Sequence, residues 1–212
     1  MFIELVDSLR CPNAHDETWL VLAARRVADR DIIEGTLGCP VCHAEFPIVD
    51  GVARLDGGTP RLTVSDSAPN EDAALRLAAQ LDLTDPRGYA VLVGALGVHG
   101  PLIATMTDVQ LLLTDPPPGI GMGRGLSGIT TVAGSARLPL APASARGVAL
   151  DVSASPELVL ASVAVLRPGG RLVAPVSLSL PEELTELARD DEVRVAERAT
   201  ATSGIISLSR KR

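Results

Sequence analysis

The sequence predicts an α/β fold in which a small β-rich unit precedes a larger unit built on a mainly parallel sheet. Three observations predict it. All three cysteines lie at or before Cys42 in a chain of 212 residues. A stretch rich in Gly, Pro, Ser, Thr and Asp follows the β-rich part. Beyond it, apolar runs of strand length alternate with helical or irregular connections, a pattern typical of strands covered on both faces.

These patterns divide the chain into a β-rich domain at residues 1–57, a linker at 58–70 and an α/β domain at 71–212. The first domain contains two β-like runs, Trp19–Ala24 and Asp31–Leu37. The segment Glu45–Leu55 follows, and its central Asp-Gly pair predicts a strand, a tight turn and a second strand.

The α/β domain is expected to begin with a helix at Glu71–Leu83, where apolar residues recur at helical spacing after an acidic start. A second helix is predicted at Pro156–Leu166, which proline opens. At the C-terminal end the pattern predicts a helix at Pro181–Arg189 and then an antiparallel pair, Glu192–Ala199 with Gly204–Ser209. The expected buried strands are Ala90–Gly94, Val109–Thr114, Ile129–Ala133, Gly147–Asp151 and Gly170–Val176.

The composition argues against direct binding to nucleic acid or membrane. The formal net charge is −7, and the chain has only four aromatic residues. The chain therefore offers no excess of cationic side chains for phosphate contacts and few aromatic side chains for base stacking. Glu4 and Asp7 interrupt the start of the chain, so it does not resemble a signal peptide, and no apolar run has the roughly 18 residues of a membrane span. We expect a cytoplasmic protein that acts through a protein partner or self-association.

A metal site is predicted from the cysteines. Cys39 and Cys42 form a Cys-x-x-Cys pair, and Cys11 is followed four residues later by His15. Cysteine thiolates and a histidine nitrogen are the usual ligands of tetrahedral zinc. His43 competes as the fourth ligand, although its adjacency to Cys42 makes simultaneous coordination awkward. The alternatives are a metal-free ribbon with cysteines as small apolar residues, and a redox pair. Zinc is favoured because so small a domain rarely folds without a metal ion or a disulfide to stabilise it.

Three segments of the first domain carry a specific resemblance: Leu9–Pro12, Gly38–Cys42 and Phe46–Val52. They resemble the small zinc-ribbon protein that activates tRNA, rRNA and release-factor methyltransferases. The Phe-Pro-Ile-x-Asp-Gly-Val run after Cys-x-x-Cys is its most distinctive part. His15 stands where the family commonly has a second cysteine. The resemblance implies a zinc ribbon and a link to methyltransferases.

The second domain resembles class I S-adenosylmethionine methyltransferases, which implies a reduced Rossmann-like sheet ending in an antiparallel hairpin. The segment Leu166–Gly170, Leu-Arg-Pro-Gly-Gly, is similar to the family's turn before its fifth strand, where the glycines permit a positive φ angle. Ala133–Pro142 resembles the family's Gly-Asp-Ala-x-x-Leu-Pro-Phe segment. Ser135 stands at the acidic position that contacts adenine in the family, and Asp151 follows the next strand.

The family's cofactor loop corresponds to Val91–Gly100. Gly94 and Gly97 keep the glycine spacing, but Leu92 stands at the position of the usual acid. Asp115 ends the next strand, where the fold commonly binds ribose hydroxyls. The resemblance thus implies that S-adenosylmethionine would contact Gly94, Gly97, Asp115 and Ser135. Asp115 is followed by three prolines and a glycine-rich stretch, so we expect no helix there.

No catalytic residue is predicted, because no nucleophile and base stand out and His99 is a lone loop histidine. We therefore expect a non-catalytic scaffold or activator protein, a pseudo-methyltransferase, related to the modification of RNA or translation factors. The alternative is an S-adenosylmethionine-dependent methyltransferase with an atypical cofactor site. A third possibility is a dimerisation platform in which the ribbon covers an edge of the sheet.

Overall fold

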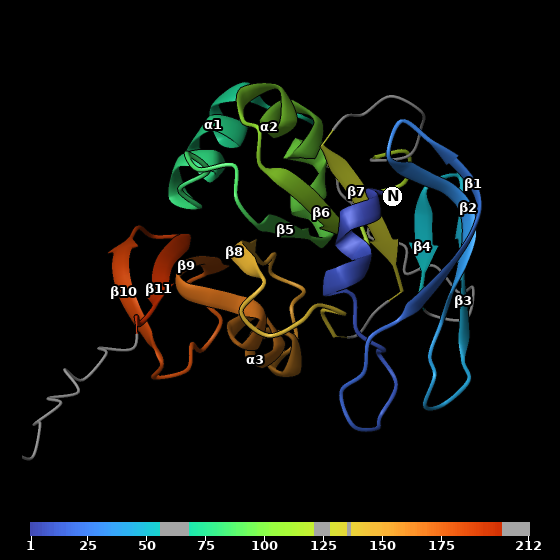
Figure 1. Ribbon diagram of the computed structural model, residues 1–212. Helices are drawn as coiled ribbons and strands as arrows, with labels where there is room; N and C mark the ends of the chain where they lie inside the picture. The colour runs from blue at the N-terminus through green and yellow to red at the C-terminus, as the bar shows by residue number, and fades with distance from the viewer. Residues whose placement is uncertain (56–67, 121–127, 135–136, 201–212) are drawn as a thin grey trace, which may run out of the picture.

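The computed structural model describes residues 1–55, 68–120, 128–134 and 137–200 (Figure 1). Within these ranges the fold is mixed α/β, as predicted, and is organised around one sheet of 11 strands. The strand order is β1-β2-β3-β4-β7-β6-β5-β8-β9-β11-β10. The N-terminal strands and the α/β strands therefore belong to the same sheet.

The N-terminal part begins with a 3-10 helix, η1 (Ile3–Ser8), and continues as an antiparallel meander. Asp50 and Gly51 join its last two strands, and both have positive φ angles, 49° and 81°. Such angles match the twist of a two-residue hairpin turn, so the predicted Asp-Gly turn is confirmed. The four strands are β1 (Val21–Ala28), β2 (Asp31–Gly38), β3 (Glu45–Val49) and β4 (Val52–Arg54).

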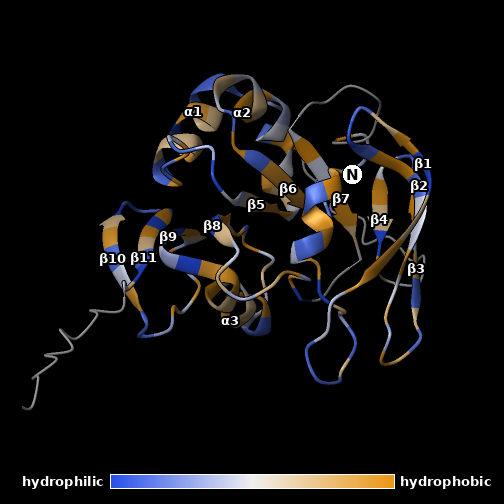
Figure 2. Ribbon diagram, in the orientation of Figure 1, coloured by the Kyte–Doolittle hydropathy of each residue, from blue (hydrophilic) through white to orange (hydrophobic). Residues whose placement is uncertain are grey.

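The rest of the sheet has five parallel strands and a final antiparallel hairpin. Counted from β5, the strand order reads 3-2-1-4-5 and then the hairpin, which is the predicted class I methyltransferase type of sheet. The parallel strands consist mainly of buried apolar residues (Figure 2). The strands are β5 (Tyr89–Val93), β6 (Gln110–Thr114), β7 (Ile129–Ala133), β8 (Ala145–Ala149), β9 (Leu166–Pro175), β10 (Leu184–Arg189) and β11 (Val193–Arg198).

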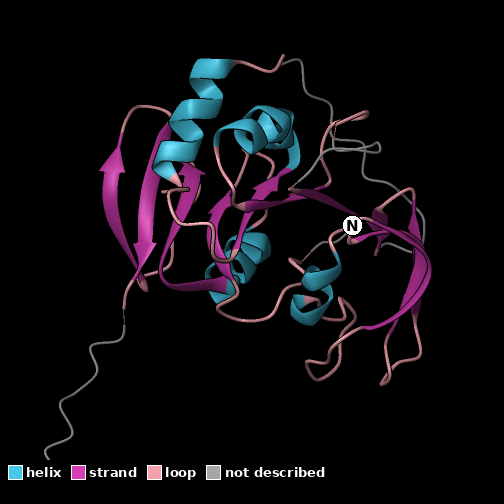
Figure 3. Ribbon diagram, turned by 45° about the horizontal axis from the view of Figure 1, so that its top comes forward, coloured by secondary structure: helices cyan, strands magenta, loops and turns pink. Residues whose placement is uncertain are grey.

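Helices lie on both faces of the sheet (Figure 3). Helix α1 (Glu71–Gln80) lies on one face with η2 (Gly94–His99) and α2 (Gly100–Met106). Helix α3 (Pro156–Val165) and η1 cover the other face. Both long helices have side-chain caps, because Asn70 accepts a hydrogen bond from the Ala73 amide and Ser155 accepts one from the Leu158 amide. A bilayer-spanning helix is not found in the described ranges.

The N-terminal meander is attached to the α/β part by a parallel pairing of β4 with β7. Val52, Ala53 and Arg54 pair with Thr131, Val132 and Ala133. A second junction forms where Arg10 donates to the Pro139 carbonyl and Ala141 donates to that of Ser8. Apolar side chains from both parts form one buried cluster, which includes Leu9, Leu37, Phe46, Val132, Leu140 and Val148. The meander thus covers the β7 edge of the sheet.

The helix predicted at Pro181–Arg189 is wrong, because residues Leu184–Arg189 form strand β10. Their composition is compatible with a helix, but a helix this short is marginal by itself. Pairing with β11 gives the segment backbone hydrogen bonds along one side instead. The C-terminal hairpin is therefore β10–β11, and the predicted strand Gly204–Ser209 lies outside the described residues. Gly169 has the expected positive φ, 74°, but it lies inside β9, which already starts at Leu166, where the pairing with β8 is irregular.

We expect the substitution Leu9→Ala to lower the free energy of unfolding by about 2–5 kcal/mol, as typical for leucine truncation in a core. Leu9 is fully buried and forms a β-bridge with Leu140 across the junction. Urea denaturation followed by circular dichroism measures the change. Leu75→Ala, at a residue that is 59% exposed on α1, is the matched control and should change stability by less than about 0.5 kcal/mol. Equal effects of the two substitutions would contradict a shared core at the junction.

Candidate functional site

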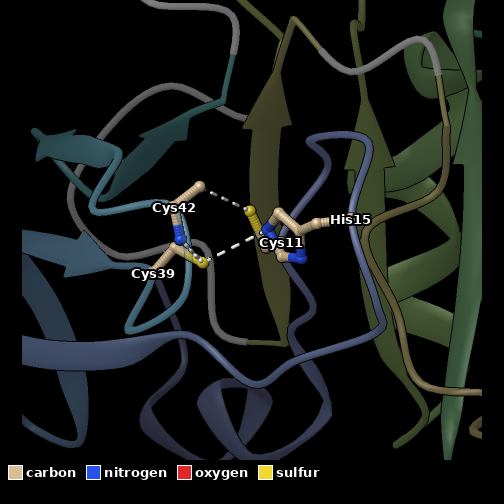
Figure 4. Close-up of side chains that lie close together, drawn as sticks. All are labelled: Cys11, His15, Cys39 and Cys42. Atoms are coloured by element: carbon tan, nitrogen blue, oxygen red, sulfur yellow. Dashed lines mark hydrogen bonds between the residues drawn. The ribbon is translucent and has the colours of Figure 1, made fainter.

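Four predicted metal ligands come together at the N-terminal part of the chain (Figure 4). Cys11 and His15 come from the loop after η1, and Cys39 and Cys42 from the turn between β2 and β3. One ligand atom from each residue lies within 4.8 Å of all the others. This is the Cys₃His set predicted from the sequence.

Backbone hydrogen bonds shape both loops. The Cys11 amide donates to the Thr18 carbonyl at 3.0 Å and closes the first loop at its base. In the second, the Cys39 amide donates to the Ala44 carbonyl at 2.9 Å, and the His43 amide donates to the Cys39 carbonyl at 3.0 Å. His43 adopts a positive φ of 57° and is not a member of the cluster. The structure therefore brings His15, and not His43, to the cysteines.

Two distances inside the cluster match the edges of a tetrahedral zinc site. With Zn–S bonds of about 2.3 Å and a Zn–N bond of about 2.0–2.1 Å, the edges of the tetrahedron are about 3.8 Å between sulfurs and about 3.6 Å between sulfur and nitrogen. The Sγ atoms of Cys11 and Cys42 are 3.8 Å apart, and Cys39 Sγ is 3.4 Å from His15 Nε2. The cluster could hold a metal ion without rearrangement of the backbone.

The imidazole of His15 is oriented for coordination through Nε2. Its Nδ1 lies 2.6 Å from the Asp16 carbonyl oxygen, which assigns the Nδ1 proton to that hydrogen bond. The lone pair of Nε2 then points toward Cys39. A second, outer contact comes from Asn13, whose side-chain amide donates to Cys42 Sγ at 3.3 Å. Such outer hydrogen bonds fix ligand orientation in metal sites.

The cysteines differ in acidity. The Ala44 backbone amide, with help from Asn13, lowers the pKa of Cys42 to about 6, whereas burial raises the pKa of Cys11 to about 12. A bound metal ion would displace the proton of Cys11, because metals bind the thiolate. The segment after Cys42 leads directly into β3 and forms no helix. The helix N-terminus that commonly activates a redox Cys-x-x-Cys pair is therefore missing from this segment.

We expect the purified protein to bind zinc, and His15→Ala to lower the zinc affinity more than about a hundredfold, which exceeds the effect of losing an outer hydrogen bond. His43→Ala is the matched control, four positions beyond Cys39, and should leave the affinity unchanged. Competition with a chromogenic chelator measures both. Equal losses in the two variants, or a wild-type protein without zinc affinity, would overturn this ligand assignment.

The predicted cofactor loop follows β5, and its first glycine packs against the chain itself. Gly94 has a φ of 59°, and a Cβ atom built there would lie 2.1 Å from Asp151 Oδ2. The same oxygen accepts a hydrogen bond from the Ala95 amide at 2.8 Å. The other carboxylate oxygen accepts from the Ser153 amide and hydroxyl at 2.9 and 2.6 Å. Asp151 thus clamps the start of the loop.

At the other glycines of the loop, the space that a side chain would need is also occupied by the protein itself. A Cβ on Gly97 would lie 2.7 Å from Pro116 Cβ, and one on Gly100 would lie 3.0 Å from the Leu113 side chain. Pro116 belongs to the segment that follows β6, so it closes the space between the ends of β5 and β6. The absence of side chains at these positions lets two segments of the protein touch.

The acidic groups expected near a nucleoside are missing or engaged elsewhere. Leu92 is fully buried in the core between the sheet and α1. Asp115 is 9% exposed, and its Oδ1 accepts a hydrogen bond from the Gly134 amide at 2.5 Å. That bond ties the end of β6 to the end of β7. Ser135 lies outside the described residues. Gly94, Gly97 and Asp115 thus all make close contacts within the chain, and their contacts with a cofactor stay a prediction.

A pocket of about 680 Å³ lies beside the closed loop, at the carboxyl ends of β8 and β9. Its walls come from α1, η2, the segment after β8, the end of β9 and the turn between β10 and β11. His99 lines it and is 9% exposed, and burial lowers the pKa of this histidine. No sequence pattern indicated that His99 lines a pocket, because His99 differs from an incidental loop histidine only by its packing.

The chain matches no family model and no curated protein. Solved structures similar to part of it include the antibiotic-resistance methyltransferase Kmr, with 16% identity over 66% of this chain and 98% of that one and a TM-score of 0.43. The putative methyltransferase yhhF from Escherichia coli has 12% identity over 65% and 91%, with a TM-score of 0.48. The 1,6-didemethyltoxoflavin-N1-methyltransferase of Burkholderia thailandensis has 15% identity over 61% and 77%, with a TM-score of 0.44.

We expect Gly97→Ala to destabilise the free protein by about 1–3 kcal/mol, the usual cost of an overpacked site. The new methyl group would collide with Pro116, whose ring cannot turn away. Gly38→Ala is the matched control, since its nearest neighbour would lie 3.9 Å from the new Cβ. Thermal denaturation without added ligand compares the two. An unchanged melting temperature for Gly97→Ala would show that this glycine is not needed for internal packing.

Proposed function

We propose that this chain is a non-catalytic scaffold or activator protein of a methyltransferase system, with a metal-binding ribbon joined to a sheet that no longer holds S-adenosylmethionine. One observation carries the proposal. Asp151, Pro116 and Leu113 of the same chain lie against the glycines that would approach the cofactor. A glycine-spaced loop binds a nucleotide only where its backbone stays open to the ligand.

The electrostatics of the crevice supports the same proposal. Leu92 provides no carboxylate, and Asp115 uses an oxygen to hold the Gly134 amide. Hydrogen bonds from a carboxylate to ribose hydroxyls need an oxygen directed at the ligand. The ribbon adds the second element, since its cysteine-rich segments resemble the activator of tRNA, rRNA and release-factor methyltransferases. We therefore infer a protein partner that modifies RNA or translation factors.

The second candidate function is an S-adenosylmethionine-dependent methyltransferase with an atypical cofactor site. The pocket of about 680 Å³ beside the loop favours it, because ligands of open α/β sheets bind at the carboxyl ends of strands where the strand order reverses. A methyl group can be transferred largely through positioning, without a dedicated base.

Titration calorimetry of the full chain with S-adenosylmethionine and S-adenosylhomocysteine separates the two functions. We expect no saturable heat at millimolar ligand, since internal contacts occupy the loop. A dissociation constant in the micromolar range would contradict the proposal and favour the enzyme.

The scaffold role has its own readout in cells. We expect loss of the gene to reduce methylation of tRNA, rRNA or release factors, and a Cys39→Ser chain to restore it poorly because the ribbon loses a ligand. Quantitative mass spectrometry of these substrates measures the change. Unchanged methylation in the deletion strain would contradict the activator role.

A further inference from the structure

The pocket beside the closed loop contains a buried carboxylate without a cationic partner. Asp151 lines the pocket and is 8% exposed. Its three hydrogen bonds come from the Ala95 amide and from the amide and hydroxyl of Ser153. Within the described ranges, its carboxylate takes part in none of the ion pairs. A buried charge is normally paired, because burial removes its hydration.

A second polar group in the same pocket lacks a hydrogen bond. Nδ1 of His99 is buried and has no partner in the described part of the chain. The imidazole lies at the end of η2, whose first residues contact Asp151. Buried polar atoms of native proteins are usually satisfied by protein, water or ligand. Because this nitrogen is covered by the protein itself, the free acceptor position of Asp151 is the one that a ligand in the pocket would reach.

The remaining surface of the pocket is mostly apolar. Leu77 of α1, Leu96 of η2, Val173 of β9 and Val193 of β11 line it. Asp190 and Glu192 add two carboxylates at the solvent-exposed turn between β10 and β11, and Arg76 of α1 adds one positive charge. The charged groups are thus weighted toward carboxylates. A ligand with an apolar body and a positive charge would complement this surface.

We propose that this pocket is a binding site for a small primary amine in its ammonium form, with a compact apolar body. The charge would pair with Asp151, whose carboxylate has four acceptor positions and uses three. An N–H group would satisfy that position, and the apolar body would lie against the leucine and valine side chains. The volume of about 680 Å³ is in the usual range of small-molecule sites. This binding role goes beyond the scaffold function and does not depend on it.

Three compounds of similar size test the ligand class by calorimetry on the full chain: 2-phenylethylamine, its N-trimethyl derivative and 3-phenylpropionate. We expect 2-phenylethylamine to bind. The trimethyl derivative should bind about tenfold more weakly or worse, because it keeps the charge but has no N–H donor. The carboxylate should not bind, since it would face Asp151. No binding of the amine at millimolar concentration, or equal binding of all three, overturns the proposal.

Substitutions in the pocket test whether the amine binds there. Asp151→Asn should weaken 2-phenylethylamine binding about tenfold or more through loss of the charge. Because Asp151 also clamps the loop, a second variant avoids the clamp: Ala73→Phe projects a ring from α1 into the pocket and should abolish binding. Leu75→Phe, on the same helix but outside the lining, should leave binding unchanged. Wild-type affinity in Ala73→Phe would overturn the assignment of the site.

The outcome is separable from the test of the scaffold function. Amine binding without S-adenosylmethionine binding supports both ideas. S-adenosylmethionine binding would contradict the scaffold, but it would leave the amine result to be judged by the compound series and by Ala73→Phe. Amine binding that survives Ala73→Phe would overturn only the pocket assignment.

Discussion

The parallel pairing of β4 with β7 is the contact on which the arrangement of the molecule depends. Without it, β7 would be an uncovered edge strand, which is a site of unwanted association. The pairing extends beyond β4, because the Leu55 amide donates to the Ala133 carbonyl at 2.8 Å. It therefore fixes the end of β7, next to the Gly134 amide that Asp115 binds. The ribbon and the closed crevice are connected through this one strand.

The ribbon has two independent sources of stability. Its apolar residues belong to the same buried cluster as the α/β part, and Cys39 is a member of that cluster as well as of the metal site. A small β unit normally needs a metal or disulfide because it cannot bury enough apolar surface. Here the adjoining sheet supplies much of that surface. A bound metal ion would then act locally and hold the loop of Cys11 and the turn of Cys39 together.

The sequence predicted the features that depend on local chemistry. Asp50-Gly51 specified a tight turn, Pro156 specified a helix start, and the cysteine spacing specified the metal cluster. Sequence-based prediction failed where contacts with a distant segment determine the structure. Residues Leu184–Arg189 are polar enough for an exposed helix, and only the free edge of β11 makes them a strand. Likewise, His99 and Asp151 are 52 positions apart and no periodic pattern links them. Only the fold brings both to one pocket.

The glycine loop shows why such a motif is ambiguous. Glycine at Gly94 and Gly97 indicates that something approaches the backbone closely, but the spacing does not say whether it is a ligand or the protein. Two other residues favour internal packing over a ligand here, as the proposed function requires. Leu92 turns the usual acidic position into core, and Pro116 places a rigid ring where the crevice between β5 and β6 would open. A chain that retained its glycines for packing alone would keep the motif after losing the cofactor. The residues facing a glycine loop are therefore better evidence of binding than the glycines.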